Sequence, residues 1–434
     1  MIPIFQLVHA GVYWILDFVS PAEFYVYPYL LSKGLIPYQQ ITDHHFPGLF
    51  FLPVNFFTLG FVGPLSFKLL LLLTIILTSV LLAKLSRFKS INGASLYQVI
   101  FLYSLWQLFF SGSVFWIEAI LPLFMLPGLI LFEKKRFLLS GLFFAFAVLF
   151  KQTAILPIIF LSLYLLKKPL QLASFWLPTA ILFLLLGWYF YNLGVLSDFV
   201  WWNFTFNLNY YPAAAYRPPT VPDWLKISLP LTLFLASAWT VLKTKSEFGI
   251  KLAILIIILA LPGFSRFGLE HFQSAVPFFC LLIVLAVRRT TFAWIPVVGF
   301  SLLWVGFFIF RSHPSSSLIN FSKSDQLLYQ KVSQLSESGK TVFALGTSPL
   351  VYSQASRVPP GRFFFFPLPW LFSLLESKQL EILKTSPPDF IIFNPESQVD
   401  NLSIFTTAPG LVEYMQQNYQ VQATVSGHLI YQHL

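Results

Sequence analysis

The chain has 434 residues, of which 57% are hydrophobic and only 10% are charged, and its formal net charge is +10. A soluble protein cannot hide so much apolar surface, so the composition excludes one and predicts a polytopic α-helical membrane protein. The one cysteine, Cys280, excludes an intramolecular disulfide and a cysteine-cluster metal site.

Eleven apolar stretches approach the length that a membrane-crossing helix requires. They cover about 3–19, 65–83, 95–111, 115–132, 137–150, 153–166, 172–192, 226–243, 249–263, 271–288 and 292–310. Roughly 20 helical residues cross the hydrocarbon core, and the backbone there must bond internally. We therefore predict about eleven transmembrane helices.

The basic residues alternate between the two sides of these predicted helices. Thirteen follow the even-numbered helices: Lys84, Arg87, Lys89, Lys134, Lys135, Arg136, Lys167, Lys168, Lys243, Lys245, Lys251, Arg288 and Arg289. Six lie in the intervening loops: Lys33, Lys151, Arg217, Lys226, Arg266 and Arg311. The positive-inside rule places the first set in the cytoplasm, and the second set and the C-terminal segment outside. The positive net charge therefore indicates how the chain is oriented in the membrane, and we predict no nucleic-acid partner.

Most acidic residues before position 320 lie on the predicted external side. They are Asp17, Glu23, Asp43, Glu118, Asp198, Asp223 and Glu270. Carboxylates near lipid need a partner or a water-filled cavity, so these acids indicate a functional site. The alternative is that the outer face simply tolerates acids, which applies most to Asp198 and Asp223 in a long loop.

Two predicted external loops are long: 20–48, rich in Tyr and Pro, and 193–225, which contains Trp201, Trp202, Tyr210 and Tyr211. This aromatic density is typical of a membrane interface and also suits stacking on sugar rings. Residues 49–83 are too long for a single crossing. We therefore expect the apolar run 49–63 to form an interfacial or re-entrant helix.

Polar residues return from about position 320, with 7 basic and 8 acidic residues. Strand-like runs at 341–345, 389–393 and 422–431 alternate with helical patterns near 323–337, 369–384 and 409–418. This alternation predicts a small extracytoplasmic α/β domain. We therefore divide the chain into a transmembrane domain, 1–319, and a C-terminal domain, 320–434.

Four motifs carry a family resemblance. They are Gly34-Leu-Ile-Pro37-Tyr38-Gln-Gln-Ile-Thr-Asp43-His44-His45-Phe-Pro47-Gly48, Trp116-Ile-Glu118, Phe150-Lys151-Gln152-Thr153, and Ser265-Arg266-Phe-Gly-Leu-Glu270-His271-Phe-Gln273 before Pro277. In this order, and on the predicted external side, they resemble the GT-C glycosyltransferases. These are the multi-span enzymes related to protein O-mannosyltransferases and the lipid A aminoarabinose transferase.

The resemblance implies a GT-C-like fold and a multi-pass plasma-membrane glycosyltransferase of the cell envelope, in EC class 2.4. Such an enzyme takes a sugar from a polyprenyl-phosphate carrier, with inversion, and passes it to a hydroxyl of a lipid, glycan or protein outside the cytoplasm. The chain departs from the family pattern at Gln40, where Asp is usual. It also lacks a clean match for the acid near the start of the first loop, where Glu23 is nearest and Asp17 is next.

The reaction requires a carboxylate base near the acceptor hydroxyl, and Asp43 and Glu23 are the candidates, with Glu118 as a third catalytic acid. Each has a structural alternative. Asp43 suits an Asx turn, Glu23 a solvated loop, and Glu118 the positive end of a helix dipole.

The leaving phosphate requires cations, for which we predict Lys151 and Arg266, with Lys68 as a weaker candidate. The alternative for the first two is that they reach to lipid headgroups. The remaining predicted substrate-binding residues are Tyr38, His44, His45, Gln152, His271 and Gln273, although His271 equally suits a core position.

Adjacent side chains of an extended strand point in opposite directions, so we do not expect His44 and His45 to share a metal ion. A divalent cation bound by one of them and a carboxylate is the alternative, and no cofactor is certain. Two rival functions remain. One is a transporter or lipid-glycan flippase, although a carrier would place its charges near the bilayer midplane. The other is an inactive scaffold, which Gln40 suggests.

Overall fold

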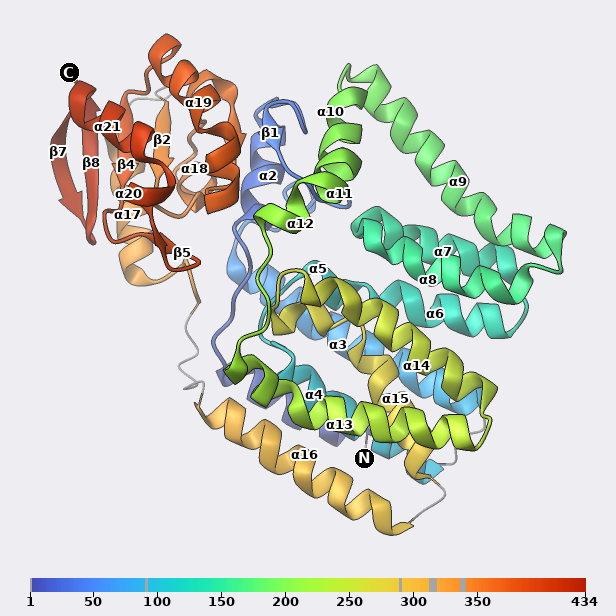
Figure 1. The fold of residues 1–434 in the computed structure, drawn as a ribbon. Helices are drawn as coiled ribbons and strands as arrows, with labels where there is room; N and C mark the ends of the chain where they lie inside the picture. The colour runs from blue at the N-terminus through green and yellow to red at the C-terminus, as the bar shows by residue number, and fades with distance from the viewer. Residues whose placement is uncertain (1, 90–92, 289–290, 312–317, 336–340) are drawn as a thin grey trace. The chain divides into compact units, whose positions relative to one another are not determined.

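The computed structural model describes residues 2–89, 93–288, 291–311, 318–335 and 341–434 (Figure 1). Two compact units make up the chain, each built from three separate segments. Unit 1 consists of Met1–Val19, Leu65–Leu186 and Tyr216–Ser317, and unit 2 of Ser20–Pro64, Gly187–Ala215 and Leu318–Leu434. Unit 2 thus combines most of the two predicted external loops with the C-terminal segment. The division into domains 1–319 and 320–434 stays a prediction.

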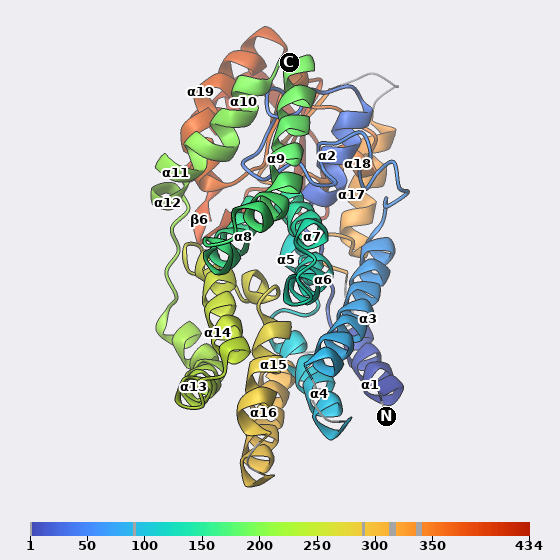
Figure 2. The same cartoon turned by 90° about the vertical axis from the view of Figure 1, so that its right-hand side faces the viewer.

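Apolar helices build unit 1, and all eleven predicted stretches fall on them (Figure 2). They are α1 (Ile2–Ile15), α3 (Pro64–Phe88), α4 (Gly93–Phe109), α5 (Ile117–Ile120), α6 (Pro122–Glu133), α7 (Phe137–Phe150), α8 (Ile155–Ser162), α9 (Pro169–Asn192), α13 (Val221–Lys243), α14 (Glu247–Ala260), α15 (Val276–Val287) and α16 (Thr291–Arg311). The stretch 115–132 is divided between α5 and α6, because Pro122 begins a new helix.

Four helices of the described chain are long and apolar enough to cross a membrane alone: Pro64–Phe88, Pro169–Asn192, Val221–Lys243 and Glu247–Phe264. Five further apolar helices are shorter: Ile4–Ile15, Phe137–Phe150, Gln152–Leu165, Val276–Val287 and Trp294–Ile309. These helices support an integral membrane protein, as the composition predicts. The number of crossings stays a prediction.

Small residues let neighbouring helices of unit 1 approach closely. The Ser140 hydroxyl of α7 donates to the Gly128 carbonyl of α6 at 2.8 Å. A Cβ atom at Gly141 would lie 2.0 Å from the Phe175 carbonyl oxygen of α9, so only glycine fits there. Such small residues are typical of helix contacts in lipid, where close packing replaces the hydrophobic effect as the driving force.

The apolar run 49–63 consists of turns and bends, so the prediction of an interfacial or re-entrant helix there is wrong. Three hydrogen bonds join Asn55 and Thr58: from Asn55 N to Thr58 Oγ1 at 2.9 Å, from Thr58 N to Asn55 Oδ1 at 3.1 Å, and from Thr58 Oγ1 to the Asn55 carbonyl at 2.9 Å. Pro53 lacks a backbone donor, and Gly60 adopts a φ of +82°. Side-chain bonds of this kind compete with helical backbone bonds, which apolar composition alone does not reveal.

The C-terminal segment of unit 2 forms a four-stranded sheet in the order β2–β4–β8–β7 (Figure 1). Its strands are β2 (Val342–Leu345), β4 (Phe390–Phe393), β7 (Tyr419–Val425) and β8 (His428–His433), and only β2 and β4 pair in parallel. Helices α17 (Lys323–Gln334), α18 (Leu350–Gln354), α19 (Pro369–Thr385) and α21 (Pro409–Asn418) complete the predicted α/β character.

The run expected at 422–431 is a hairpin rather than one strand. Ser426 and Gly427 both have positive φ, 51° and 78°, as a tight two-residue hairpin turn requires.

Hydrogen bonds join the three segments of unit 2. In the first loop, β1 (Ile41–Thr42) follows α2 (Glu23–Ser32) and pairs in parallel with β3 (Phe364–Phe365) of the C-terminal segment. In the second loop, α10 (Leu196–Val200) continues into a π-helical turn, Trp201–Phe206, and then α11 (Asn207–Asn209) and α12 (Tyr211–Ala214). The Asn207 side chain donates to the His44 carbonyl at 2.7 Å. Segments joined in this way lie on one side of a membrane.

Candidate functional site

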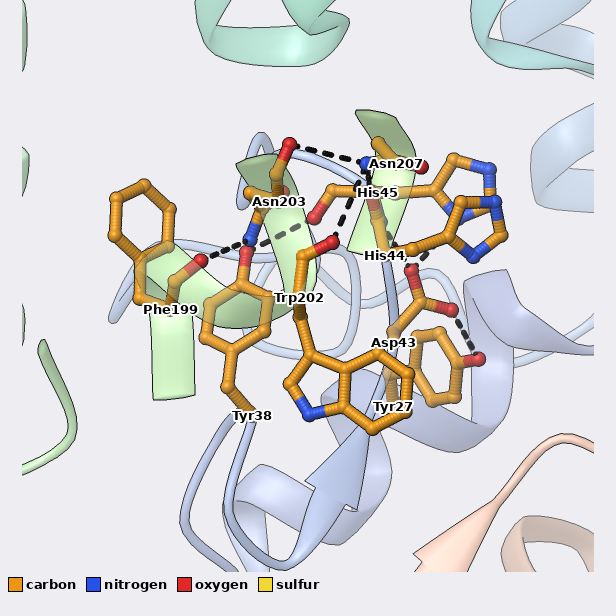
Figure 3. Close-up of polar contacts among 9 residues, drawn as sticks. All are labelled: Tyr27, Tyr38, Asp43, His44, His45, Phe199, Trp202, Asn203 and Asn207. Atoms are coloured by element: carbon orange, nitrogen blue, oxygen red, sulfur yellow. Dashed lines mark hydrogen bonds and ion pairs between the residues drawn. The ribbon is translucent and has the colours of Figure 1, made fainter. Parts of the chain in front are cut away.

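A buried carboxylate with three donors lies at the centre of the first-loop motif. Asp43 Oδ1 accepts from the backbone N–H of His45 at 2.6 Å and lies 2.7 Å from His45 Nδ1, while Oδ2 accepts from the Tyr27 hydroxyl at 2.5 Å (Figure 3). The first of these bonds is that of an Asx turn. The Asx turn, which is the structural alternative for Asp43, is therefore present. The same carboxylate also binds the side chains of Tyr27 and His45.

These donors decide the charge of Asp43. Burial raises its pKa, but the charge and hydrogen bond of His45, the charge of His44 and the Tyr27 hydroxyl together hold the pKa well below its usual value. Burial and the neighbouring carboxylates raise the pKa of Tyr27 well above its usual value. Asp43 is therefore ionised at neutral pH, and Tyr27 stays a hydrogen-bond donor.

The imidazole rings of His44 and His45 lie side by side, with centroids 4.2 Å apart (Figure 3). The expectation that these adjacent side chains point in opposite directions is wrong, because the Asx turn bends the chain and Asp43 holds the His45 ring. His44 also stacks on Tyr211 of the second loop at 4.6 Å and meets Trp370 of the C-terminal segment edge-on at 5.3 Å. All three segments of unit 2 thus contribute to this cluster.

The same three residues are the natural candidates for a metal site. Their ligand atoms all lie within 4.8 Å of one another. However, two ligands of a tetrahedral ion lie roughly 3.3 Å apart when each is about 2.0 Å from the metal. Asp43 Oδ1 and His45 Nδ1, at 2.7 Å, are at hydrogen-bond distance instead. As arranged, Asp43 Oδ1 and His45 Nδ1 are hydrogen-bonded to each other and do not fit as two ligands of one ion.

Glu23, the second predicted base, is also buried, with 9% of its surface exposed, so it is not a solvated loop acid. Its Oε2 atom has no hydrogen-bond partner. Burial, offset in part by a backbone hydrogen bond and supplemented by the charge of Asp43, raises the pKa of Glu23 to about 7. Unit 2 therefore contains two neighbouring carboxyl groups whose pKa values are shifted in opposite directions, upward for Glu23 and downward for Asp43.

This shift gives a testable stability prediction. Because the folded pKa of Glu23 exceeds its usual value of 4.5, the folded state holds the extra proton between these pH values. Stability therefore falls as pH rises from about 4.5 through about 7. We expect Glu23→Gln to unfold at a higher temperature than the wild type at pH 8, with a gain of at most about 3 kcal/mol, and the gain to disappear near pH 5.

Thermal unfolding of detergent-purified protein at both pH values measures this gain, and Glu381→Gln, at an exposed position of α19, is the matched control. A gain that is equal at pH 5 and pH 8 would contradict the assignment.

Tyr38, which is predicted to bind substrate, is 1% exposed and packs beneath the first-loop motif. Its hydroxyl donates to the His45 carbonyl at 2.9 Å, and its ring packs on Phe51, Phe190 and Phe199. We therefore assign Tyr38 to holding the turn that carries His45, rather than to direct contact with substrate.

A second buried carboxylate lies in unit 1. Glu118 of α5 is 2% exposed, and its Oε1 atom accepts from Lys151 Nζ and lies 2.8 Å from His271 Nδ1. Its Oε2 atom has no partner, and a cavity of about 10 Å³, near the size of one water molecule, is lined by all three residues. Lys151 is therefore not a lone cation, and His271 is neither solvent-exposed nor an apolar core residue.

The other predicted site residues of unit 1 are held in different ways. The Gln273 side chain donates to the carbonyls of Ser111 and Val114, at 2.6 and 3.2 Å, and so fixes a turn. Gln152 begins the short helix η1 (Gln152–Ala154) next to Lys151. Lys68 donates to the Trp14 carbonyl at 3.0 Å.

Backbone hydrogen bonds bridge Arg266 to a second arginine, Arg217. Arg217 N donates to the Ser265 carbonyl at 3.1 Å, and Phe267 N donates to the Arg217 carbonyl at 2.8 Å. The two arginines, 49 positions apart in the sequence, are therefore adjacent in unit 1.

Sequence reasoning missed four members of the unit 2 cluster. Tyr27 lies in the loop that is rich in Tyr and Pro, and Asn207 lies in the second long loop, but no motif marks either residue. Tyr211 was noted only as an interfacial or stacking aromatic residue. Trp370 lies in the C-terminal segment, far from any motif, and no local pattern marks it.

No protein-family model and no curated protein matches the chain. Two crystal structures of ArnT from Cupriavidus metallidurans are similar to it. The one bound to undecaprenyl phosphate has a TM-score of 0.62 at 11% identity, and the one in the apo state has 0.61 at 12%. Each comparison covers 99% of this chain and 97% of ArnT. The chain therefore has the fold of ArnT, an aminoarabinose transferase, which confirms the GT-C-like architecture that the four motifs predict.

Proposed function

We propose that the chain is a glycosyltransferase that takes a sugar from a polyprenyl-phosphate carrier and transfers it, with inversion, to an acceptor hydroxyl on the extracytoplasmic side. The observation that carries this proposal is the buried pair of carboxyl groups in unit 2. The donors around Asp43 hold its pKa well below the usual value, while burial raises the pKa of Glu23 to about 7. Carboxyl groups whose pKa values are separated in this way are typical of sites that transfer protons.

Two further observations support the class of donor. The chain shares the fold of ArnT, one structure of which holds undecaprenyl phosphate. Unit 1 also contains largely apolar cavities of about 760 Å³ and about 220 Å³. The smaller one lies among α13, α14 and α15 and is lined by side chains such as Phe234, Ile257 and Phe279. Such surfaces suit an isoprenoid tail.

The reaction breaks the bond between the anomeric carbon and the phosphate oxygen, whose electron pair stays on the phosphate. The acceptor oxygen bonds to the same carbon from the opposite face and gives its proton to a base. Cations stabilise the leaving phosphate. We assign this role first to Arg266, with Arg217 beside it, and then to Lys151, because Lys151 already shares its charge with Glu118.

The external location rests on the distribution of charge. Both long loops belong to the set of connections that carries few Lys and Arg residues, which the positive-inside rule places outside. The C-terminal segment is hydrogen-bonded to the first loop through β1 and β3. It therefore shares whichever side that loop occupies.

The test uses purified protein in liposomes with radiolabelled polyprenyl-phosphate sugars and a mixed extract of membrane lipids and glycans as acceptors. We expect the label to move to an acceptor, with release of polyprenyl phosphate, and Asp43→Ala protein that still folds to lose this transfer. The control, His428→Gln, changes a partly exposed histidine at the start of β8 and should keep this transfer. Counterflow of intact substrate without bond cleavage would establish a carrier instead, and the absence of both would indicate a scaffold.

A further inference from the structure

We infer that His45 accepts the proton of the acceptor hydroxyl, and that Asp43 is the positioning residue that orients its imidazole ring. This inference rests on the proposed function and concerns the same site. It replaces the carboxylate base of our sequence-based prediction with a histidine. The inference rests on the hydrogen-bonded arrangement Tyr27–Asp43–His45, because each hydrogen bond determines whether the next group can donate or accept a proton.

Asp43 is poorly suited to accept a further proton. Its side chain is buried, with 4% of the residue exposed. Oδ1 already faces two N–H groups of His45, and Oδ2 faces the Tyr27 hydroxyl at 2.5 Å. A carboxylate with three donors is strongly stabilised in its charged form, and a weak base contributes little to proton transfer near neutral pH.

His45 has the complementary properties. An ionised carboxylate only accepts hydrogen bonds, so the Nδ1 atom that faces Asp43 must carry the ring proton of the neutral imidazole. Nε2 is then the acceptor nitrogen. The side chain is 22% exposed, in contrast to 5% for Asp43, so it is the member of the pair that a substrate can reach.

The His45 ring is also held in position. The His44 ring lies against it, tilted by 37° with centroids 4.2 Å apart, and the Tyr38 hydroxyl donates to the backbone carbonyl of His45 at 2.9 Å. A base fixed in this way needs little reorganisation before it reacts. The same logic, a carboxylate on Nδ1 and a reacting group on Nε2, is that of the Ser-His-Asp triad.

In the resulting step, the acceptor hydroxyl places its hydrogen on His45 Nε2 as its oxygen bonds to the anomeric carbon. The bond from that carbon to the phosphate breaks, and the phosphate leaves with the electron pair. His45 becomes an imidazolium ion, whose Nδ1–H faces the negative charge of Asp43. The proton then passes to water or to the departing phosphate, which restores the neutral ring.

Glu23 is the competing base. It is buried, its Oε2 atom has no partner, and its pKa responds to the charges of both Asp43 and His45. The titratable groups that surround His45 are Glu23, Tyr27, Tyr38, Asp43, His44 and Tyr211. Of these, Asp43 lies at hydrogen-bond distance from Nδ1 of the ring, 2.7 Å away, and so makes Nε2 the nitrogen that accepts.

The decisive variant is His45→Asn. Its amide N–H can replace Nδ1–H as a donor to Asp43, but nothing replaces Nε2, so the turn is kept and the base is removed. We expect kcat to fall by roughly 10²- to 10⁴-fold, with the donor KM changed by less than about threefold. His428→Asn, at a partly exposed position at the start of β8, is the matched control.

The pH profile separates a chemical from a structural role. Wild-type transfer should fall on the acid side as Nε2 becomes protonated, and the residual transfer of His45→Asn should lack this acid limb. A fall in rate with an unchanged acid limb would overturn the inference, as would near-wild-type transfer in His45→Asn with loss in Glu23→Gln. So would transfer that a chelator abolishes and zinc restores.

Thermal unfolding of each variant shows whether it folds, and His45→Gln, with a longer amide side chain, replaces His45→Asn if that protein does not. If the wild type transfers no sugar from any polyprenyl-phosphate donor, the proposed function fails. If the wild type transfers and both His45 variants do so at the same rate, only this inference fails.

Discussion

Replacing Glu118 with Gln is expected to destabilise the protein by about 3 kcal/mol or more, because the change leaves Lys151 charged and without its partner in a buried site. Glu118 is 2% exposed, and the Lys151 side chain is 16% exposed, so solvent screens this pair weakly. His271 loses the same carboxylate from Nδ1. The temperature of unfolding in detergent measures the loss.

Two further variants separate stability from chemistry. Glu118→Gln combined with Lys151→Met removes both charges and should regain much of the lost stability, because no buried charge is left unpaired. If Lys151 contacts the leaving phosphate, this double variant should still transfer sugar poorly. If Lys151 serves only as a partner for Glu118, its transfer rate per folded molecule should match the wild type.

Glu133, the last residue of α6, offers the matched control for Glu118 of α5. It closes α6 and pairs with Lys89 and Lys251, and the Lys251 side chain is 5% exposed. Glu133→Gln should also lower the unfolding temperature, but its transfer rate per folded molecule should stay that of the wild type. Unfolding of Glu118→Gln at the wild-type temperature would contradict the role we assign to this buried pair.

Most helices of unit 1 could be predicted from composition, since a backbone in hydrocarbon has few alternatives to a helix. The run 49–63 shows the limit of that reasoning. Its apolar content equals that of a helix, but Asn55 and Thr58 bond to each other and Pro53 lacks a donor. Hydropathy averages over such individual bonds and cannot detect them.

The candidate site was predicted in part, for a different reason. The motif around Asp43 marked three consecutive polar residues, and the order of the other motifs marked Glu118, Lys151 and His271. The partners that decide their chemistry lie far away in the sequence. His271 meets Glu118 across 153 positions, and Trp370 reaches His44 from the C-terminal segment. Only the fold reveals that Lys151 is paired with Glu118. Only the fold likewise reveals that His45, and not only Asp43, is a candidate to accept the proton.

The pairing of the first loop with the C-terminal segment could not be predicted either. Strands β1 and β3 contain two residues each, Ile41–Thr42 and Phe364–Phe365. Two residues carry no detectable alternation, so periodicity gives no signal at this length. The same pairing brings Trp370, five residues after β3, into the unit that holds the motif.

Replacing Asp43 with Asn is expected to slow transfer by roughly 10²- to 10³-fold while the fold is retained. In the wild type, Oδ1 accepts from both the backbone N–H and Nδ1 of His45. The backbone donor will keep the amide oxygen of Asn at this place, so Nδ1–H and the tautomer of His45 are preserved. What is lost is the negative charge that stabilises the imidazolium ion as it forms.

Asp43→Ala removes the acceptor as well as the charge, so it leaves Tyr27 and His45 without their partner and frees the ring to change tautomer. We expect a larger loss than for Asn, of roughly 10³- to 10⁴-fold, as when the orienting carboxylate of a catalytic histidine fails to hold the tautomer. Single-turnover transfer at pH 7.5, with unfolding temperatures for both variants, measures the two losses.

A stability profile gives an independent check on the same carboxylate. Because the folded pKa of Asp43 lies below its usual value, the stability it contributes is present above about pH 4 and is lost only as pH falls towards the folded pKa. Asp43→Asn should therefore be less stable than the wild type at neutral pH, and the two should converge in strong acid. If Asn and Ala slow transfer equally, the negative charge of Asp43 accounts for the whole loss, and its role as the hydrogen-bond acceptor that orients His45 adds nothing. If neither slows it, the base lies outside the Tyr27–Asp43–His45 arrangement.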